Sequence, residues 1–255
     1  MRKIKKLGYL AMAFLMLTGS ILTQNPSVPV VDAADTTSEP VMTTMAEPEN
    51  LALNTKITDS LVHDRAHYYS ITTDNKNVDY EFLLINDAPS DDPNFSILYI
   101  NIVVQPFRKD GIYDYKKRVI KGEYVDPTRA RTYKNRVTLK KNTKYLITLT
   151  PFYLTETPYH FSVYQVSRTP ALKKVTPKKG KVVVQFSKTQ IAKSYEIAVK
   201  KQGGSWKTYK TKKNTYTIKN FKSKKQYSIR VRSMCTVNGT KKYSAWSKTK
   251  KVKVK

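Results

Sequence analysis

Two histidines four residues apart are the first candidates for chemistry in this chain of 255 residues. His63 and His67 enclose Asp64 in the order of the H-E-x-x-H zinc motif, with Asp in place of Glu. That motif needs a helix, because positions i and i+4 then place both imidazoles on one face around zinc. The run Tyr68–Ile71 is typical of a strand, in which the two rings would lie about 13 Å apart. We therefore expect no zinc site, and a small secreted metallohydrolase using both histidines remains the alternative function.

A loop rich in aspartate is the second candidate. Asp87, Asp91 and Asp92 offer hard oxygen ligands that suit Ca²⁺, but they lack the Asp-x-Asp-x-Asp spacing, so a solvated turn is the favoured interpretation. The sequence also has no G-x-S-x-G motif and no Gly-rich phosphate loop. These observations predict a protein that is not an enzyme, with no catalytic residues, no metal site and no cofactor.

The charge distribution is the strongest functional signal. Residues 170–255 hold 24 Lys and two Arg against one acid, Glu196, a net charge of +25, whereas residues 35–169 hold 17 basic and 17 acidic residues. Lysines on edge strands also protect against aggregation, but ordinary soluble surfaces mix both signs. The imbalance therefore predicts contact with a polyanion. The candidate binding residues are Lys222, Lys224, Lys225, Lys248, Lys250, Lys251 and Lys253.

The type of cation indicates which polyanion to expect. Lysine suits diffuse, salt-sensitive retention, whereas bidentate recognition favours arginine. An anionic cell-wall polymer, such as a teichoic acid of a Gram-positive bacterium, or another extracellular polyanion fits this composition. Nucleic acid is not the expected partner, since it more often brings arginine and a stacking surface.

The N-terminus predicts export. A cationic start, Met1–Lys6, precedes an uncharged apolar run of 16 residues, Leu7–Leu22, and the small residues Val31 and Ala33 follow near a cleavage position. We predict a signal peptide over 1–33, a disordered linker over 34–52, no transmembrane span in the mature chain, and a secreted or cell-surface location. The lone Cys235 cannot form an internal disulfide and is predicted to be a small buried hydrophobe.

The middle segment, 53–168, is predicted to be an antiparallel β-sandwich of jelly-roll type. The run Ser96–Val104 is almost wholly apolar and predicts a central strand buried on both faces. An exposed cluster of Tyr113, Tyr115 and Tyr124 is a candidate glycan contact, with half-buried sheet tyrosines as the alternative. The predicted strands are Ala66–Thr72, Val78–Asn86, Ile97–Pro106, Val119–Tyr124, Arg131–Leu139, Lys144–Pro151 and Tyr159–Gln165.

Two stretches of this segment carry a family resemblance. Asn142–Tyr145 occupies the place of a Gly-Thr-Tyr-Tyr turn and strand, with Asn142 replacing the glycine, and Tyr159–Val163 is similar to a closing Tyr-x-Phe-x-Val strand. Over Asn54–Val166 the chain thus resembles the bacterial pre-peptidase C-terminal domains. The resemblance implies a non-catalytic β-sandwich appendage of a secreted protein. The partner that we expect for this segment is a glycan or a protein.

The segment 170–255 alternates apolar and polar residues in seven short strands, with turns at Lys201–Gly204 and Asn238–Gly239. Phe221 precedes Tyr227 by six residues, and Tyr243–Ser247 reads Tyr-Ser-Ala-Trp-Ser. These motifs resemble a fibronectin type III domain of the Lys-rich kind in Gram-positive surface proteins, with Phe186 in place of the usual Trp. The resemblance implies structural roles for Phe221, Tyr227, Arg230, Arg232 and Trp246, with the two arginines stacked on the tryptophan.

The overall prediction is an all-β chain of two consecutive antiparallel β-sandwiches after a signal peptide, the first jelly-roll-like and the second immunoglobulin-like. Its expected function is that of an exported, non-catalytic surface or secreted binding protein with a role in adhesion, retained by the cationic module. The alternatives are the metallohydrolase, an accessory module of a secreted hydrolase, and a purely structural stalk.

Overall fold

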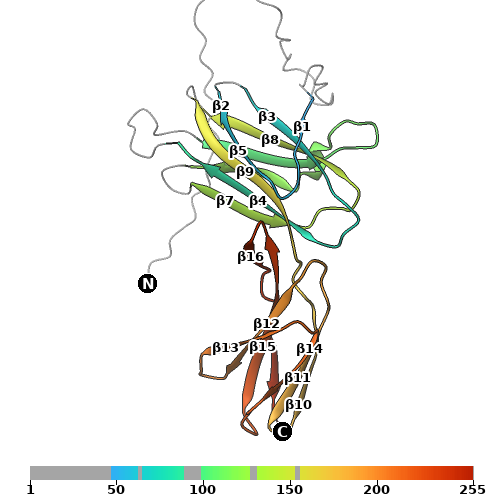
Figure 1. Ribbon diagram of the computed structural model, residues 1–255, viewed down its shortest axis with the longest axis vertical. Coiled ribbons are helices and arrows are strands. Elements are labelled where there is room, and N and C mark those ends of the chain that lie inside the picture. Colours follow the sequence, from blue (N-terminus) through green and yellow to red (C-terminus); the bar gives the residue numbers. More distant parts are fainter. Residues whose placement is uncertain (1–46, 63–64, 89–98, 127–130, 153–155, 255) are drawn as a thin grey trace, which may run out of the picture. The chain divides into compact units, whose positions relative to one another are not determined.

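The computed structural model describes residues 47–62, 65–88, 99–126, 131–152 and 156–254. In these ranges the chain is almost entirely β, and the one helical element described is a 3₁₀ turn, Tyr115–Lys117. The strands form four sheets, which make two sandwiches (Figure 1). The predicted all-β class with two antiparallel sandwiches is confirmed. The predicted signal peptide lies outside the described residues, and no helix among those described is long and apolar enough to cross a membrane.

The first sandwich packs a five-stranded sheet against a four-stranded one. The five-stranded sheet has the order β1 (Glu49–Asn50), β3 (His67–Thr72), β8 (Lys144–Phe152), β5 (Tyr99–Pro106) and β6 (Ile120–Val125). The four-stranded sheet has the order β2 (Lys56–Leu61), β9 (Thr157–Val166), β4 (Asp79–Asn86) and β7 (Thr132–Val137). All neighbours are antiparallel except β1 and β3. The fold thus contains two strands, β1 and β2, that the sequence did not predict.

The first sandwich also begins earlier than predicted. Glu49 and Asn50 pair with Tyr69 and Ser70 of β3, and the Leu51 side chain is only 5% exposed. The predicted linker over 34–52 therefore includes residues that belong to the sheet. Because these few residues have no alternating pattern, their pairing with β3 left no signal in the sequence.

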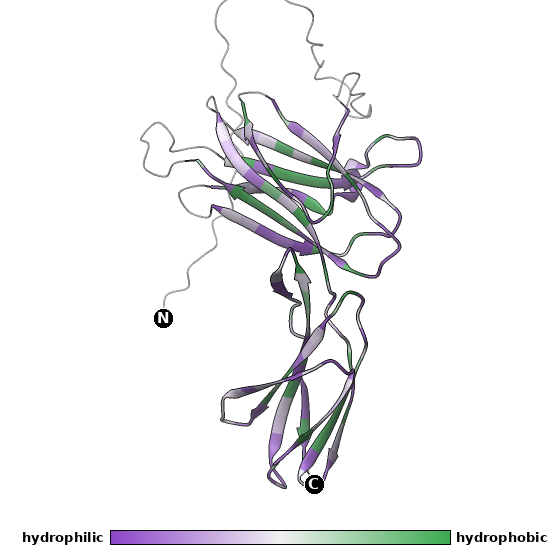
Figure 2. Ribbon diagram, viewed as in Figure 1, coloured by the Kyte–Doolittle hydropathy of each residue, from purple (hydrophilic) through white to green (hydrophobic). Residues whose placement is uncertain are grey.

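The core of the first sandwich lies between its two sheets (Figure 2). In β5, Ile100, Ile102 and Val104 are fully buried, whereas Asn101 and Val103 are half-buried. The strand is central, between β8 and β6. Its second face is buried at Gln105 but only partly covered at Asn101 and Val103, which corrects the prediction of burial on both faces, and Ser96–Leu98 of the predicted run lie outside the described residues.

The second sandwich packs a three-stranded sheet against a larger one. The smaller sheet has the order β10 (Leu172–Lys178), β11 (Lys181–Phe186) and β14 (Thr215–Lys219). The larger has the order β13 (Trp206–Thr211), β12 (Ser194–Lys201), β15 (Gln226–Val237) and β16 (Thr240–Tyr243), and β17 (Lys250–Lys253) also pairs with β15. This arrangement is that of an immunoglobulin-like sandwich, the class to which fibronectin type III domains belong.

Local sequence explains most of this second sandwich. Val182, Val184 and Phe186 alternate into its core, where Ile229 and Val231 of β15 meet them. The turn at Lys201–Gly204 is closed by a hydrogen bond from the Gly204 N–H to the Lys201 carbonyl, 2.9 Å long. At Asn238–Gly239 both residues have positive φ, 48° and 75°, as a two-residue hairpin requires. Both predicted turns are therefore present.

Cys235 is 2% exposed and packs with Val166 and Val237 in a small separate cluster. Its sulfur accepts a hydrogen bond from the Ser167 N–H at 3.4 Å. The side chain thus occupies the buried position expected of a small apolar residue.

Candidate polyanion-binding site

The loop between β14 and β15 carries three of the predicted lysines and is held at both of its ends. The rings of Phe221 and Tyr227 meet edge to face with 4.5 Å between centroids. The Tyr227 hydroxyl accepts a hydrogen bond from the Lys222 N–H at 3.0 Å. The Lys224 N–H donates to the Val254 carbonyl at 2.9 Å, and the Val254 N–H donates to the Lys225 carbonyl at 3.1 Å. These bonds fix the loop against the end of the last strand.

A hollow of about 600 Å³ lies beside this loop, and we call it the lysine hollow. The Gln202 N–H donates to the Gln226 carbonyl at 3.0 Å, which brings the β12–β13 turn to the same place. None of the lining residues is acidic, and all are exposed; they are Lys201, Gln202, Lys224, Lys225, Gln226 and Lys253. Four lysines thus line one concave surface, and the positive field there favours a ligand with several negative charges.

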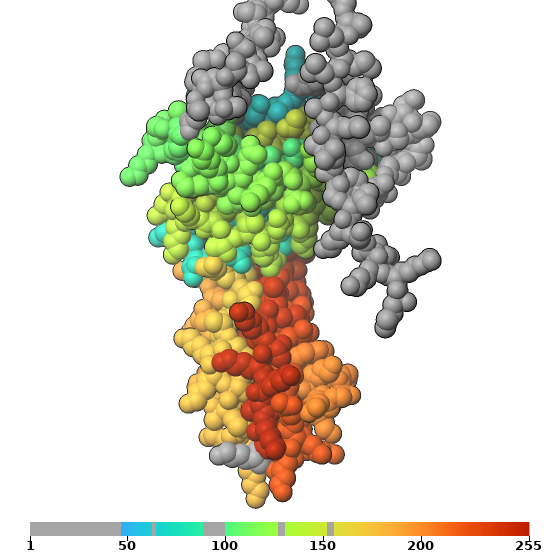
Figure 3. Space-filling view, turned by 180° about the vertical axis from the view of Figure 1, so that it is seen from behind, coloured from blue at the N-terminus to red at the C-terminus, as the bar shows by residue number. Residues whose placement is uncertain are grey.

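The lysine hollow contains three of the seven predicted lysines, Lys224, Lys225 and Lys253. Lys222 lines a neighbouring cavity instead. The remaining three, Lys248, Lys250 and Lys251, are exposed near or on the C-terminal strand, which lies at the surface in Figure 3, but they line neither cavity.

Lys201 was missed by the sequence analysis. It ends β12, and its place in the hollow depends on the register that pairs it with Tyr227 on β15. Because β17 also pairs with the start of β15, with Gln226 opposite Lys253, the three strands end together. The turn at Lys201–Gly204 indicates that a strand ends at Lys201, but local spacing does not show that this strand pairs with β15.

The arginines of this sandwich are engaged elsewhere. The Arg230 guanidinium lies between the rings of Trp206 and Trp246, at 4.1 and 4.6 Å from their centroids. Arg232 lies between Trp246 and Tyr243, at 4.4 and 4.2 Å. The structure thus stacks both arginines on Trp246, and Trp206 and Tyr243 extend the ladder beyond the residues that the resemblance implied. Such stacked guanidinium groups stabilise the sheet.

The candidate glycan contacts of the first sandwich lie on three different elements. Tyr113 is half-buried and forms an isolated bridge with Phe107, Tyr115 starts the 3₁₀ turn and is 39% exposed, and Tyr124 on β6 is 59% exposed. None of the three lines the lysine hollow or its neighbouring cavity. Their role as a sugar platform stays a prediction.

Of the two histidine candidates, the structure describes His67, which takes part in hydrogen bonds with nearby side chains. His67, on β3 and not on a helix, lies with its Nδ1 2.8 Å from the Tyr159 hydroxyl and 3.2 Å from an Asp59 carboxylate oxygen. The Tyr159 and Tyr69 hydroxyls are 2.5 Å apart, and burial raises the pKa of Tyr69 to about 12. Burial raises the pKa of Tyr159 as well, so both phenols are protonated at neutral pH and are poor nucleophiles. His63 lies outside the described residues.

The aspartate loop is described only in part. Asp87 is hydrogen-bonded to Nδ1 of His160, whereas Asp91 and Asp92 lie outside the described residues. Across the part of the chain that the structure describes, no three His, Cys, Asp or Glu side chains are grouped so that they could hold a metal ion.

No family model matches this chain, and no curated protein matches it by sequence. Among solved structures, the pre-peptidase C-terminal domain of collagenase from Bacillus anthracis matches at 16% identity with a TM-score of 0.35, covering 47% of this chain and 97% of that one. The FN1–FN3 domains of chicken CNTN1 match at 14% identity with a TM-score of 0.31, covering 72% and 61%. A β-1,2-glucanase from Parabacteroides distasonis matches at 12% identity with a TM-score of 0.31, covering 78% of this chain but 32% of the glucanase. These likenesses carry no information on function.

Proposed function

We propose that this protein is an exported, non-catalytic binding protein whose second sandwich retains it on anionic polymers of the cell surface. The observation that carries the proposal is the lysine hollow, which Lys201, Lys224, Lys225 and Lys253 line with no acidic residue among them. Exposed ammonium groups that repel one another gain most from a ligand whose negative charges repeat along a chain.

The expected ligand is a phosphate-rich or carboxylate-rich wall polymer outside the cell. Lysine ammonium groups act as point charges on flexible stems, so they can follow a mobile polymer without a fixed geometry. Single exposed ion pairs contribute only about 0.2–1 kcal/mol each, and useful retention therefore needs several at once. The hollow supplies four within one surface.

Retention on isolated Gram-positive cell walls tests the proposal. The variant K201E/K224E/K225E/K253E reverses the charge of the hollow and should lower the retained fraction at least about tenfold, since several ion pairs are lost and replaced by repulsion. Salt at about 0.5 M should release the unaltered protein, because screening weakens exposed ion pairs.

A matched control separates the hollow from net charge. The variant K188E/K193E/K212E/K213E changes the net charge by the same amount, on exposed lysines of the loops at the opposite end of the sandwich. It should keep most of the retention. Equal losses in the two variants, or retention that survives high salt, would contradict a localised electrostatic site.

Sequencing the N-terminus of the protein recovered outside the cell tests export and cleavage near Ala33.

A further inference from the structure

A second cavity of about 740 Å³ opens beside the lysine hollow, on the flank of the sandwich between β13 and β14. These two strands are edges of different sheets, so no strand closes the flank. Tyr209 pairs with Ile197 and Tyr216 pairs with Val184, both of them core residues, which means that the two tyrosines occupy inward-facing positions. Because they stand at open edges, they remain half-buried and line the cavity.

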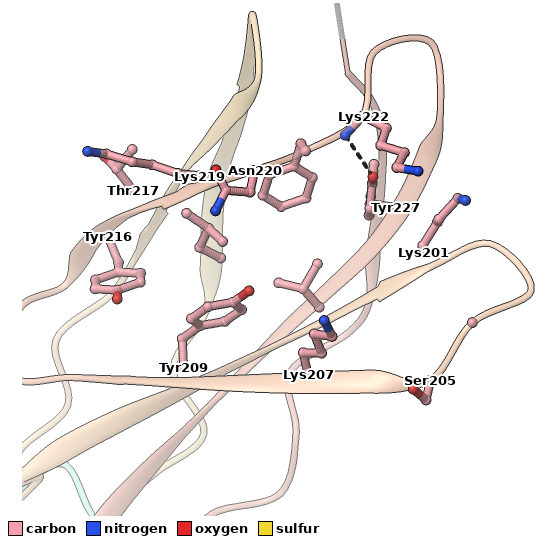
Figure 4. A pocket seen from close by; sticks show the side chains of 14 residues that line it. Lys201, Ser205, Lys207, Tyr209, Tyr216, Thr217, Lys219, Asn220, Lys222 and Tyr227 are labelled. Carbon is pink, nitrogen blue, oxygen red and sulfur yellow. Dashed lines mark hydrogen bonds between the residues drawn. The ribbon is translucent and has the colours of Figure 1, made fainter.

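The two tyrosine rings form an aromatic wall. Their centroids are 6.2 Å apart, and the ring planes are inclined by 42° (Figure 4). The apolar floor beneath them, made by Ile218 and Phe221, is 2% and 8% exposed and offers little free surface. The surface that a ligand can reach is therefore aromatic and polar and lacks a deep apolar channel of the kind that an acyl chain needs.

The cavity is also cationic. Lys201, Lys207 and Lys222 are exposed lining residues on the Tyr227 side of the two tyrosines (Figure 4), and no lining residue is acidic. Lys207 lies two residues from Tyr209 on β13 and faces the same side of the sheet. Lys201 lines both this cavity and the lysine hollow, so the two form one continuous surface.

We propose that this cavity binds a pyranose ring that carries a negative charge, one unit of an anionic glycan whose neighbouring charges lie in the lysine hollow. The inference rests on the proposed function and specifies its ligand. The apolar face of the sugar packs on Tyr209 and Tyr216, as flat aromatic rings allow, and Lys207 and Lys201 meet its carboxylate or phosphate. A polyanion without sugar rings gains only the electrostatic part of the binding free energy.

The test compares two soluble probes with six carboxylates each. Hexagalacturonate has pyranose rings, and hexaglutamate with an acetylated N-terminus and an amidated C-terminus has none. The unaltered protein should bind hexagalacturonate about tenfold more tightly, the expected effect of two aromatic contacts. In Y209L/Y216L this preference should disappear while the affinity for hexaglutamate stays unchanged. In Y209F/Y216F, which keeps the rings, the preference should remain.

A measurement on the unaltered protein guards against misfolded variants. Saturation of the tyrosine ring protons should transfer to the sugar ring protons of bound hexagalacturonate, because the rings lie in contact. Equal affinity for the two probes, a preference that survives Y209L/Y216L, or displacement of hexagalacturonate by dodecanoate would overturn the sugar assignment. None of these outcomes would contradict polyanion binding at the lysine hollow. The proposed function itself would be refuted if K201E/K224E/K225E/K253E bound both probes with the same affinity as the unaltered protein does.

Discussion

Arg232 donates two hydrogen bonds to Oε2 of Glu196, 2.8 Å from Nε and 2.6 Å from Nη2. Glu196 is the single acid of residues 170–255, and it is 6% exposed. The carboxylate is therefore neutralised within the sheet by an arginine that also stacks on Trp246 and Tyr243. Apart from Lys242, which bonds to Glu81 of the first sandwich, no lysine described in this sandwich forms an ion pair with an acid, which leaves their field available to an external ligand.

The first prediction concerns this pair. Arg232→Ala should lower the free energy of unfolding by about 3 kcal/mol, because it leaves a buried carboxylate without its partner. Urea unfolding followed by tryptophan fluorescence measures the loss. The double variant E196Q/R232A should recover part of it, since the uncompensated charge is gone. A double variant no more stable than Arg232→Ala would show that the stacking, and not the ion pair, accounts for the effect.

The second prediction concerns the corner at Tyr227. Tyr227→Phe removes the acceptor of the Lys222 N–H and should cost about 1 kcal/mol in urea unfolding. Hydrogen exchange at the Lys222 amide should become faster in the same variant. Tyr115→Phe, at an exposed ring of the first sandwich, should change stability by less than about 0.5 kcal/mol. An unchanged exchange rate at Lys222 would mean that the hydroxyl does not hold the loop.

Local patterns explain what the sequence predicted correctly. The alternation at Val182, Val184 and Phe186 and the six-residue spacing of Phe221 and Tyr227 are each properties of one short segment, and both are found in the core. The turn at Asn142 was also predicted from local residues, with Asn142 in the place of a glycine. Its φ of 47° lies in the left-handed region that a glycine would adopt there.

Non-local pairing explains what the sequence did not predict. β2 (Lys56–Leu61) has mostly polar side chains and belongs to the sheet because it pairs with β9, about 100 residues away. The lysine hollow likewise needs Lys201, Lys224 and Lys253, which two strand pairings, β12 with β15 and β15 with β17, and the hydrogen bond of Lys224 to Val254 bring together. The aromatic cavity depends on which strands remain edges, and that is a property of the whole sheet order.

The third prediction concerns two serines whose hydroxyls accept backbone hydrogen bonds from β15 where no described strand pairs with it on that side. β15 pairs with β17 over Gln226–Ile229 and with β16 over Met234–Val237, which leaves Arg230–Ser233 between them. There the Val231 N–H donates to the Ser247 hydroxyl and the Ser233 N–H donates to the Ser244 hydroxyl, both at 3.0 Å.

Because Val231 is fully buried, its N–H has little access to water when the Ser247 hydroxyl is removed. Ser247→Ala should therefore cost about 1–3 kcal/mol in urea unfolding, the usual effect of a buried donor left without an acceptor. Ser223→Ala, at an exposed loop position, is the matched control and should be nearly neutral. Equal stabilities of the two variants would refute the role of Ser247.

The final prediction concerns pH and Glu81, whose side chain is 1% exposed. Burial alone would raise the pKa of Glu81, but hydrogen bonds from Lys242 at 2.7 Å and Arg136 at 2.6 Å outweigh it and hold the pKa below its usual value. The folded state therefore binds this proton less tightly than the unfolded state. The resulting stabilisation is fully present above the unfolded pKa of about 4.3, and it is lost as the pH falls through the lower folded pKa.

Glu81→Gln should lower the free energy of unfolding by about 3 kcal/mol at pH 7, and the difference in this free energy from the unaltered protein should shrink between about pH 4 and pH 2. Urea unfolding at a series of pH values measures this difference, and one that stays constant down to pH 2 would show that the ionised carboxylate does not stabilise the fold.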